Sequence, residues 1–347
     1  MQIAIDATGG DHGSATVLAG ALQGARRYGV GLTLCGPEAE VRRGLAKLDT
    51  AGVEVRVVDA PDAIAMDEHP AQAVRGKPRS SIVVALAQVR DGAAGGMVSA
   101  GHSGAVMAAA LMTLGRAAGV DRPAIAAFLP TRRGQTLVLD LGAVTDPKPH
   151  QLVQFAQMGS IYLRGAHALA EPTVGLLSNG EEASKGNSLV RETHPLLEAA
   201  PGIRFAGNVE GKDIPHGVVD VIVTDGFTGN VALKVAEGAA SFVGEVVAAE
   251  VTRTLARKLA ALTLRPAFRA AKHRVDYSET GGAQLLGVNG VVVISHGRSN
   301  EIAIANAVGV AKRAADAEVP TLIARFLPGF GSAAAAVDRS LVIAAAE

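Results

Sequence analysis

The chain has 347 residues, a formal net charge of +0, a hydrophobic fraction of 48% and only 3% aromatic residues. The balanced charge and the scarcity of aromatic rings argue against nucleic acid as the main partner. Cys35 is the only cysteine, so an internal disulfide is excluded, which fits a reducing compartment such as the cytoplasm. The first residues lack the pattern of a signal peptide, and no apolar run reaches the ~18 residues of a membrane-spanning helix.

Short β-branched runs alternate with alanine-rich helical runs along the chain. The predicted strands are 3–7, 32–35, 53–58, 96–99, 136–141, 173–177, 203–206, 218–224 and 291–295, and helical runs include 14–28, 80–90, 103–114, 150–169 and 301–317. The alternation indicates βαβ units with right-handed crossovers. We therefore predict a three-layer α/β/α fold with a mainly parallel sheet, and ligands at the carboxyl ends of its strands. Cys35 lies in an apolar strand and is expected to be an inert core thiol.

Residues 239–276 form a long helical stretch without a strand signal, and we expect a projecting helical hairpin broken near 263–266. Its second part, 253–274, contains Lys and Arg but neither Asp nor Glu. A basic amphipathic helix of this kind suits an anionic membrane surface or an acidic protein partner. The alternative is a hairpin used for dimerisation alone. The apolar residues that would make the contact are Leu255, Leu259, Leu262 and Leu264. We expect one domain over 1–330, with the hairpin inserted at 239–276, and a tail at 331–347.

The loops after the first and fourth predicted strands are rich in glycine and hydrogen-bonding groups. In the loop 6–13, Gly9 and Gly10 would let backbone amides approach a ligand, while Asp11 and His12 add a carboxylate and an imidazole. The alternative is a structural turn in which Asp11 caps the following helix. The loop 98–105 would form an oxyanion or phosphate cradle, and covalent serine catalysis is disfavoured because the Gly-x-Ser-x-Gly elbow is missing. The cradle residues are Ser99, Gly101, His102 and Ser103.

Three further loops follow the next strands. In the loop 139–149, Asp140 and Asp146 would orient backbone groups or a cation and Lys148 would meet an anion, although turn chemistry alone explains these residues equally well. The loop 177–187 places Lys185 and Asn187 after a buried strand, which indicates a phosphate clamp rather than an ordinary surface lysine. The loop 207–213 adds Asn208.

The stretch 219–234 has the clearest pattern, because a buried strand leads through a short polar turn directly into a helix. A helix N-terminus presents unpaired N–H groups and the positive end of the helix dipole, which together bind anions. The loop 295–300 repeats the pattern with His296 and Ser299, where a purely structural histidine is equally possible. The candidate residues of the 219–234 stretch are Asp225, Gly226, Thr228, Gly229 and Asn230.

Motifs for nucleotide cofactors and metals are missing from the sequence. There is no Walker A motif, no Gly-x-Gly-x-x-Gly followed by an acidic residue at about 20 positions, and no His or Cys cluster with metal-ligand spacing. We therefore expect neither a cofactor nor a metal, and an anion site built from amides, hydroxyls, a lysine and histidines.

The order of short motifs resembles the PlsX family of phosphate acyltransferases over about residues 2–315. The motifs are Asp-Ala-x-Gly-Gly-Asp-His-Gly at 6–13, Ser-Ala-Gly-x-x-Gly at 99–104, Gly-Glu-Glu at 180–182, Lys-Gly-Asn at 185–187, Gly-Asn-Val-Glu-Gly at 207–211, Thr-Asp-Gly-Phe-Thr-Gly-Asn-Val-Ala-Leu-Lys at 224–234, Asp-Tyr-Ser-Glu at 276–279, Gly-Gly at 281–282 and Gly-Val-Asn-Gly at 287–290. Each motif is weak alone, but their number and order make the resemblance specific.

This resemblance implies a fold related to phosphotransacetylases and a homodimer that makes acyl phosphate from acyl–acyl-carrier-protein and inorganic phosphate. It also implies a role in phospholipid biosynthesis, a downstream glycerol-3-phosphate acyltransferase as partner, and peripheral attachment to the inner face of the cell membrane through a helical hairpin. The chain departs from the family pattern at Thr8, at His102-Ser103, around Val144 and at Ser178-Asn179. The change at Val144 removes an Asn and puts that loop's contact in question.

Because the sequence offers no activated nucleophile, we expect phosphate to attack the thioester directly, without an acyl-enzyme. Lys185, Asn187, Asn230 and the amides of Gly226 and Gly229 would hold phosphate or the oxyanion. His12 and Asp225 would orient the site or manage protons. Two rivals are a decarboxylating dehydrogenase of similar architecture and a membrane-surface scaffold that acts through the hairpin alone.

Overall fold

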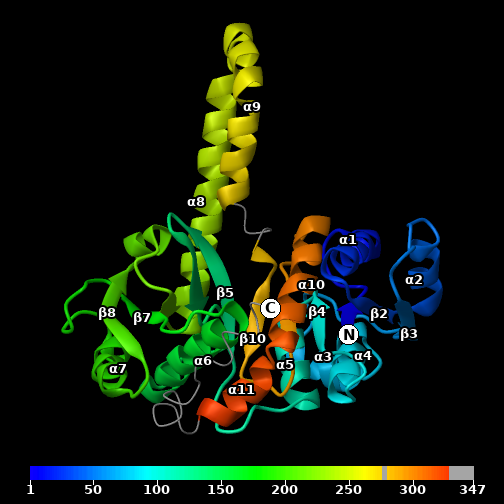
Figure 1. The fold of residues 1–347 in the computed structure, drawn as a ribbon. Coiled ribbons are helices and arrows are strands. Elements are labelled where there is room, and N and C mark those ends of the chain that lie inside the picture. Colours follow the sequence, from blue (N-terminus) through cyan, green and yellow to red (C-terminus); the bar gives the residue numbers. More distant parts are fainter. Residues whose placement is uncertain (276–279, 328–347) are drawn as a thin grey trace.

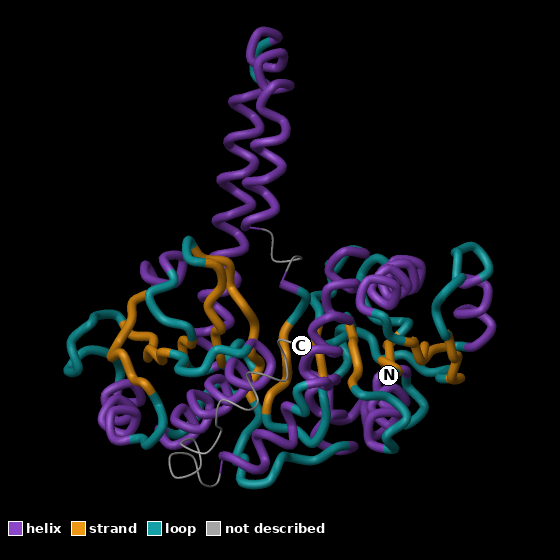
Figure 2. Tube along the Cα trace, in the orientation of Figure 1, coloured by secondary structure: helices purple, strands orange, loops and turns teal. Residues whose placement is uncertain are grey.

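A mixed sheet of 11 strands passes through the molecule, between layers of helices (Figures 1 and 2). The computed structural model describes residues 1–275 and 280–327, so the expected tail at 331–347 and the motif at 276–279 lie outside the described residues. The strands are β1 (Gln2–Asp6), β2 (Gly31–Gly36), β3 (Val55–Asp59), β4 (Gly96–Ser99), β5 (Ala124–Thr131), β6 (Gly134–Leu139), β7 (Thr173–Ser178), β8 (Arg204–Glu210), β9 (Val221–Val223), β10 (Ala283–Leu286) and β11 (Val292–Ile294).

The helices lie on both faces of this sheet. Ile3 and Ile5 of β1 pack in the same apolar cluster as α1 and α10, whereas Ala4 between them packs in a second cluster with α4 and α5. Alternate residues of a strand point to opposite faces, so the two clusters confirm the three-layer α/β/α prediction. The helices are α1 (Gly13–Tyr28), α2 (Glu38–Leu45), α3 (Pro70–Gly76), α4 (Ser81–Arg90), α5 (Ser103–Thr113), α6 (Pro149–His167), α7 (Ser188–Ala199), α8 (Gly226–Thr252), α9 (Leu255–Val275), α10 (Glu301–Asp316) and α11 (Val319–Phe326).

The sheet contains two parallel sets of strands that run in opposite directions. Its order is β3-β2-β1-β4-β11-β10-β5-β6-β9-β7-β8. The first half, β3 to β11, is parallel, and so is the second half, β6 to β8. Between them β10 is antiparallel to both β11 and β5, and β5 is antiparallel to β6. A fully parallel sheet would place the carboxyl ends of all its strands at one edge. Here the strands of the two halves run in opposite directions, so their carboxyl ends do not share an edge.

The two strands that join the halves, β5 and β10, are the ones absent from the sequence prediction. Strand β5 begins with an alanine-rich run and contains Pro130, and β10 has only four residues after two glycines. Neither segment has the apolar β-branched run that marked the other nine strands. Their strand conformation depends on antiparallel pairing with neighbours distant in sequence, which local pattern does not reveal.

Close helix packing in the first half depends on small residues of α1. A Cβ atom at Gly20 would lie 2.6 Å from the carbonyl oxygen of Glu301, and one at Gly24 would lie 2.8 Å from that of Ala305. These glycines let α1 lie directly against α10 (Figure 1). Strand β2 beneath them contains Cys35, whose side chain is fully buried. Burial, with a smaller contribution from Asp6, raises the pKa of the Cys35 thiol to about 12, so the prediction of a core thiol is confirmed.

Helices α8 and α9 form a long antiparallel pair that projects from the body (Figure 1). The chain turns at Arg253 and Thr254, between the two helices, and α9 continues through Pro266. The predicted break near 263–266 is therefore wrong: a proline removes only one N–H donor, and α9 runs through it. No helix among the described residues is long and apolar enough to cross a membrane.

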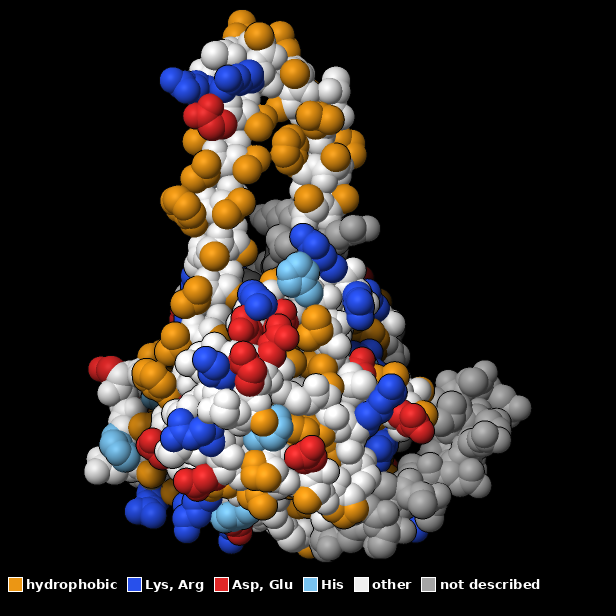
Figure 3. Space-filling model, turned by 90° about the vertical axis from the view of Figure 1, so that its left-hand side faces the viewer, with side chains coloured by type: hydrophobic (Ala, Val, Ile, Leu, Met, Phe, Trp, Pro, Cys, Tyr) orange, Lys and Arg blue, Asp and Glu red, His pale blue; other side chains and the backbone are white. Residues whose placement is uncertain are grey.

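Apolar side chains remain exposed along the hairpin (Figure 3). Leu259, Leu262 and Leu264 of α9 are 59%, 63% and 53% exposed, and Phe242 of α8 is 66% exposed. Near the turn, Glu250 pairs with Arg253 and Arg257 and offsets part of the basic charge there. The hairpin thus combines an uncovered apolar surface with a basic second helix, as predicted.

Candidate active site

A buried carboxylate, Asp6, fastens together the loops that follow β1 and β4. Asp6 is 1% exposed. Its Oδ1 accepts hydrogen bonds from the backbone N–H and the hydroxyl of Thr8 at 3.2 and 3.1 Å, and its Oδ2 accepts one from the Ser99 hydroxyl at 2.6 Å. The Ser99 oxygen in turn accepts the N–H of Gly101 at 3.0 Å. Thr8, a departure from the family pattern, also shares a hydrogen bond of 2.7 Å with Ser81 and so belongs to this network.

The glycines of these loops allow backbones to approach closely. A Cβ atom at Gly9 would lie 2.6 Å from the nitrogen of Gly101, and Gly10 adopts a φ of +95°, which favours glycine. The N–H of Asp11 donates to the carbonyl of Gly297 at 2.7 Å, so the loop after β11 joins the other two. The loops after β1, β4 and β11 therefore lie together at the carboxyl ends of their strands.

Three predicted polar residues lie at helix starts in this half. Helix α1 begins at Gly13, with the exposed His12 at its N-cap position, so the alternative in which Asp11 caps that helix is wrong. The Nδ1 atom of His102 accepts the N–H of Gly104 at 3.1 Å and caps α5. Ser103 is exposed in the first turn of α5.

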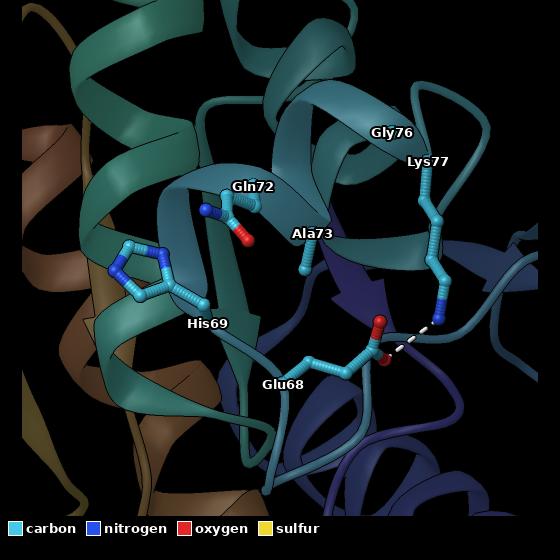
Figure 4. Close-up of a pocket in the computed structure, with 6 residues that line it drawn as sticks. All are labelled: Glu68, His69, Gln72, Ala73, Gly76 and Lys77. Carbon is cyan, nitrogen blue, oxygen red and sulfur yellow. Dashed lines mark hydrogen bonds and ion pairs between the residues drawn. The ribbon is translucent and has the colours of Figure 1, made fainter.

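A pocket of ≈ 370 Å³ lies along α3, next to this region (Figure 4). The Lys77 ammonium donates to the Glu68 carboxylate at 2.6 Å, and this bond is the main reason why the pKa of Glu68 is lowered. A Cβ atom at Gly104 would lie 2.9 Å from Pro70, which shows how closely α3 approaches α5. Because its only ammonium is already paired, this pocket is not the predicted anion site. None of the predicted site residues lines it; the lining residues are Glu68, His69, Gln72, Ala73, Gly76 and Lys77.

In the second half the corresponding anchor is Asp140, which follows β6 and is fully buried. Its carboxylate accepts four backbone N–H groups, from Ile125, Gly142, Ala143 and Val144, at 2.6 to 3.2 Å. Burial raises the pKa of Asp140, and the four donors oppose that rise by stabilising the carboxylate. Val144 contributes only its backbone N–H to this anchor, so the bond to Asp140 does not depend on the Asn that the family pattern has there.

The start of α8 packs directly onto this anchored loop. Asp225 caps the helix by accepting the N–H of Thr228 at 2.8 Å. The N–H of Gly226 donates to Val144 at 2.8 Å and that of Gly229 donates within the helix to Asp225 at 2.9 Å, so neither amide is left for the anion role that we predicted. A Cβ atom at Gly229 would lie only 2.0 Å from the carbonyl oxygen of Asp140. Both glycines therefore serve close packing between α8 and the loop.

The loop after β7 is bound to strand β8 through the side chain of Asn208, which was predicted in a loop but lies within that strand. Asn208 is 6% exposed, donates to the carbonyl of Glu182 at 2.9 Å, and has its side-chain oxygen 2.9 Å from Nδ1 of His194. Asn187 caps α7 by accepting the N–H of Val190 at 3.0 Å. These contacts give Asn187 and Asn208 structural roles.

Lys185 lies exposed in the loop between β7 and α7. Its backbone N–H donates to Glu182 at 3.0 Å, and a Cβ atom at Gly180 would lie 2.7 Å from the Lys185 side chain. Within residues 1–275 and 280–327, no carboxylate pairs with the Lys185 ammonium, whereas the neighbouring Lys212 pairs with Glu210 and Glu181. Lys185 is thus an uncompensated cation after a buried strand.

Helix α8 connects the two halves. Asn230 donates to the carbonyl of Leu141 at 3.0 Å in the second half. One turn later, about 6 Å along the axis, Lys234 lies with its Nζ atom 2.9 Å from Nε2 of His296 in the first half. Asn230 and Lys234 share a helix face because they are four residues apart. Lys234 closes the motif at 224–234, but our prediction did not include it among the site residues.

The predicted residues therefore gather into three groups rather than one. The loops after β1, β4 and β11 form the first group, those after β6 and β9 the second, and the loop after β7 with strand β8 the third. Contacts from α8 to His296 join the first two groups. In the described part of the chain, no cluster of three or more His, Cys, Asp or Glu residues has the geometry to hold a metal ion.

Solved structures with this fold include several enzymes that handle phosphate compounds. The EutD phosphotransacetylase from Staphylococcus aureus aligns with a TM-score of 0.61 at 18% identity and covers 91% of this chain and 94% of its own. A 4-hydroxythreonine-4-phosphate dehydrogenase from Klebsiella pneumoniae aligns with a TM-score of 0.54 at 14% identity, over 91% and 99% of the two chains. At these identities the likeness shows the fold, which transferases and dehydrogenases share.

Proteins with similar sequences distinguish between these classes of enzyme. A phosphate acyltransferase from Desulfitobacterium hafniense is 47% identical over 334 residues, 96% of this chain and 99% of that protein. One from Geobacter sulfurreducens is 48% identical over 308 residues, 89% of each. The fold, the strand-end loops and these relatives make the chain an acyltransferase. The model of the family described as "fatty acid synthesis protein" matches residues 1–322, and the chain belongs to this family, the PlsX family that its motifs resemble.

Proposed function

We propose that the chain transfers a fatty acyl group from acyl-carrier protein to inorganic phosphate and so supplies acyl phosphate for phospholipid biosynthesis. The observation that supports this best is the junction at α8. There, α8 bonds through Asn230 to the loop fastened by Asp140 and through Lys234 to His296. The loop of His296 in turn bonds to the loop after β1, which Asp6 fastens. The near full-length relatives named phosphate acyltransferase support the same reaction.

The proposed reaction is direct attack. A phosphate oxygen bonds to the thioester carbonyl carbon, the C–S bond breaks, and the thiol of the carrier leaves with the electron pair and a proton from phosphate or water. The thiol has a pKa near ~8.5 by analogy with cysteine, so its departure needs little acid assistance. The enzyme then contributes positioning and charge stabilisation.

Lys185 is the group we assign to the phosphate charge, because its ammonium is exposed and pairs with no carboxylate in the described part of the chain. Asn230 lies at the junction, where its amide is held against Leu141. His12, exposed at the start of α1, would manage protons, while Asp225 orients α8 through its cap. Ser99, Gly101 and the other loop residues of the first half would shape the cradle around the thioester.

The decisive experiment mixes the purified protein with acyl–acyl-carrier-protein and inorganic phosphate and traps acyl phosphate with hydroxylamine. We expect phosphate-dependent formation of the hydroxamate and release of free carrier thiol in equal amounts. Hydroxylamine also reacts slowly with the thioester itself, so an enzyme-free sample gives the background. Enzyme-dependent hydroxamate formation above that background without phosphate would indicate an acyl-enzyme instead and would reject direct attack. A decarboxylating dehydrogenase, the rival with the same fold, would instead change the absorbance of a nicotinamide cofactor during turnover.

The hairpin supports a second part of the proposal, a homodimer attached to the inner face of the cell membrane in the cytoplasm. Its exposed apolar side chains include Leu259, Leu262 and Leu264, and its second helix is basic. Such a surface binds anionic lipid through apolar burial and charge together. Attachment there would place the product near a downstream glycerol-3-phosphate acyltransferase.

Flotation with liposomes tests this attachment. We expect the protein to bind anionic vesicles and the binding to weaken as salt is added. We expect Leu262→Gln to lose binding, because the substitution keeps a side chain of similar size but removes the apolar contact. Leu196→Gln is the matched control, because Leu196 is a 44% exposed leucine on α7, far from the hairpin in sequence. Equal binding to neutral vesicles, or binding insensitive to salt, would reject the electrostatic part of the proposal.

A further inference from the structure

A small charged cluster spans the two halves of the molecule at the middle of the junction. Lys234 of α8 lies 2.9 Å from Nε2 of His296 and 3.2 Å from Oε2 of Glu237. Arg298, two residues after His296, lies 3.5 Å from the same Glu237 oxygen. The Glu237 side chain is only 12% exposed, whereas both cations are largely exposed. Residues 298 and 296 belong to the loop after β11, so these contacts bind α8 of the second half to a loop of the first.

The cluster continues directly into the predicted site on both sides. On the first-half side, Gly297 accepts the N–H of Asp11 at 2.7 Å, which links the loop of His296 to the loop after β1. On the second-half side, Asn230 lies one helical turn before Lys234 and holds the loop after β6. A displacement of Lys234 would therefore change the distance between the two sets of loops.

We propose that Lys234 is a positioning residue of the site: it holds the His296 ring, and with it the loop after β11, in register with α8. The inference rests on the proposed function for its effect on turnover, but its effect on His296 is independent of the reaction. Lys234 is not assigned contact with phosphate or thioester.

The hydrogen bonding around His296 explains why a cation holds it. The Lys234 ammonium has only donors, and the backbone N–H of Arg298 donates toward Nδ1 at 3.2 Å. A neutral imidazole accepts one donor at a time, whereas a doubly protonated ring has no lone pair for either. Either contact alone therefore favours neutral His296 over the protonated ring, and the Lys234 contact is a hydrogen bond in the tautomer that carries its proton on Nδ1.

The charges that face the ring agree with this assignment. Burial is the largest reason why the pKa of His296 is lowered, and the cations Lys234 and Arg298 lower it further. Glu237 and Asp11 oppose that shift. Removal of Lys234 should therefore let His296 bind a proton at higher pH, and removal of Glu237 should have the opposite effect.

The test compares Lys234→Met, which keeps length but removes the charge, with Lys47→Met, an exposed lysine after α2. The titration of His296 is followed by NMR of the imidazole, assigned with His296→Gln. In Lys234→Met we expect the His296 pKa to rise, kcat to fall roughly 10- to 100-fold, the KM for phosphate to stay near wild type, and the acid limb of the pH profile to move to higher pH. Lys234→Arg should restore most of kcat, and Lys47→Met should match wild type.

Two results would overturn the proposal: an unchanged His296 titration with unchanged kcat, or a change confined to the KM for phosphate, which would make Lys234 a binding group instead. If Lys234→Met does not fold, the test is made with Glu237→Gln. The proposal expects the pKa of His296 to fall in that variant, and an unchanged pKa would reject the proposal. Should the wild-type enzyme form no acyl phosphate, the proposed function fails while the NMR titration still tests the contact.

Discussion

The two halves of the sheet organise their strand-end loops differently. In the first half, side chains bond to side chains, since Asp6, Ser99 and Thr8 form one network that joins the loops after β1 and β4. In the second half, Asp140 bonds only to backbone N–H groups and fixes one loop, while Lys185 stands exposed on another. The contrast indicates a division of roles, in which the first half supplies a rigid cradle and the second supplies the charge.

The largest effect should come from removing that charge. Lys185→Ala should lower phosphate-dependent turnover on the order of 10²- to 10³-fold, as loss of a charge-stabilising group does, and should leave thermal unfolding almost unchanged because the side chain is exposed. Lys212→Ala is the matched control from the next loop, where the ammonium already pairs with Glu210 and Glu181. Steady-state kinetics of the two variants decide the matter. Near-normal turnover in Lys185→Ala would show that Lys185 does not supply the charge for phosphate. The proposed division of roles between the two halves would then be wrong.

The next effect compares the two buried anchors. Asp140→Ala would leave four backbone donors without their acceptor and should destabilise the fold by about 3–5 kcal/mol, whereas Asp6→Ala loses three bonds, two of them to hydroxyls that can rotate toward other partners, and should cost about 2 kcal/mol. Urea unfolding measures both. A larger loss in Asp6→Ala would mean that the side-chain network, rather than the backbone cage, is the stronger anchor.

Much of the fold follows from local sequence pattern, and the exceptions have a physical cause. The nine strands found from the sequence carry apolar β-branched runs, while β5 and β10 depend on antiparallel partners that are distant in sequence. Because those two strands reverse the sheet, their absence from the prediction also hid the fact that the strand ends of the two halves point in opposite directions. Local pattern gives elements, but the direction of a strand depends on non-local pairing.

The candidate site shows the same limit. The glycine-rich loops were found from sequence, and the amides of Gly226 and Gly229 were predicted to bind an anion. In the structure these amides already donate hydrogen bonds within the protein, and the missing side chains allow close packing. Lys234 was overlooked because its partner, His296, is 62 residues away. Motif reading identifies which loops matter, but only coordinates show which atoms in them are already bonded.

A third prediction tests packing at the start of α8. Gly229→Ala would place a Cβ atom 2.0 Å from the Asp140 carbonyl and should destabilise the protein by about 1–3 kcal/mol, because the backbone there cannot yield without moving the anchored loop. Gly238→Ala, on the same helix with nothing within 4 Å of the new atom, should instead stabilise by about 0.5–1 kcal/mol. Thermal unfolding midpoints should move in opposite directions. Equal shifts would show that the second-half anchor tolerates displacement and is not the rigid element described above.

The smallest effect extends the comparison to buried titratable groups away from the loops. Cys35 in the first half has its pKa raised to about 12, so its thiol stays neutral up to high pH, whereas burial lowers the pKa of His167 in the second half to about 4. The centroid of the His167 ring lies 4.7 Å from that of Phe128, in a tilted arrangement, and 5.2 Å from that of Tyr162, edge-on. Its folded pKa lies below the ordinary value of 6.5, so the unfolded chain binds the proton more readily, and stability is complete above about pH 6.5 and falls as the pH drops toward 4.

His167→Phe keeps an aromatic ring in the same cluster but removes the titratable group. We expect wild type to lose about 1 kcal/mol more than this variant between pH 7 and 5, a value reduced for partial solvent screening, and the two proteins to respond alike above pH 7. Urea unfolding at several pH values gives the difference, in which the other histidines cancel because both proteins contain them. If the two stability curves stay parallel down to pH 5, His167 is not the group that makes the second half acid-sensitive, and the two halves do not differ in this respect.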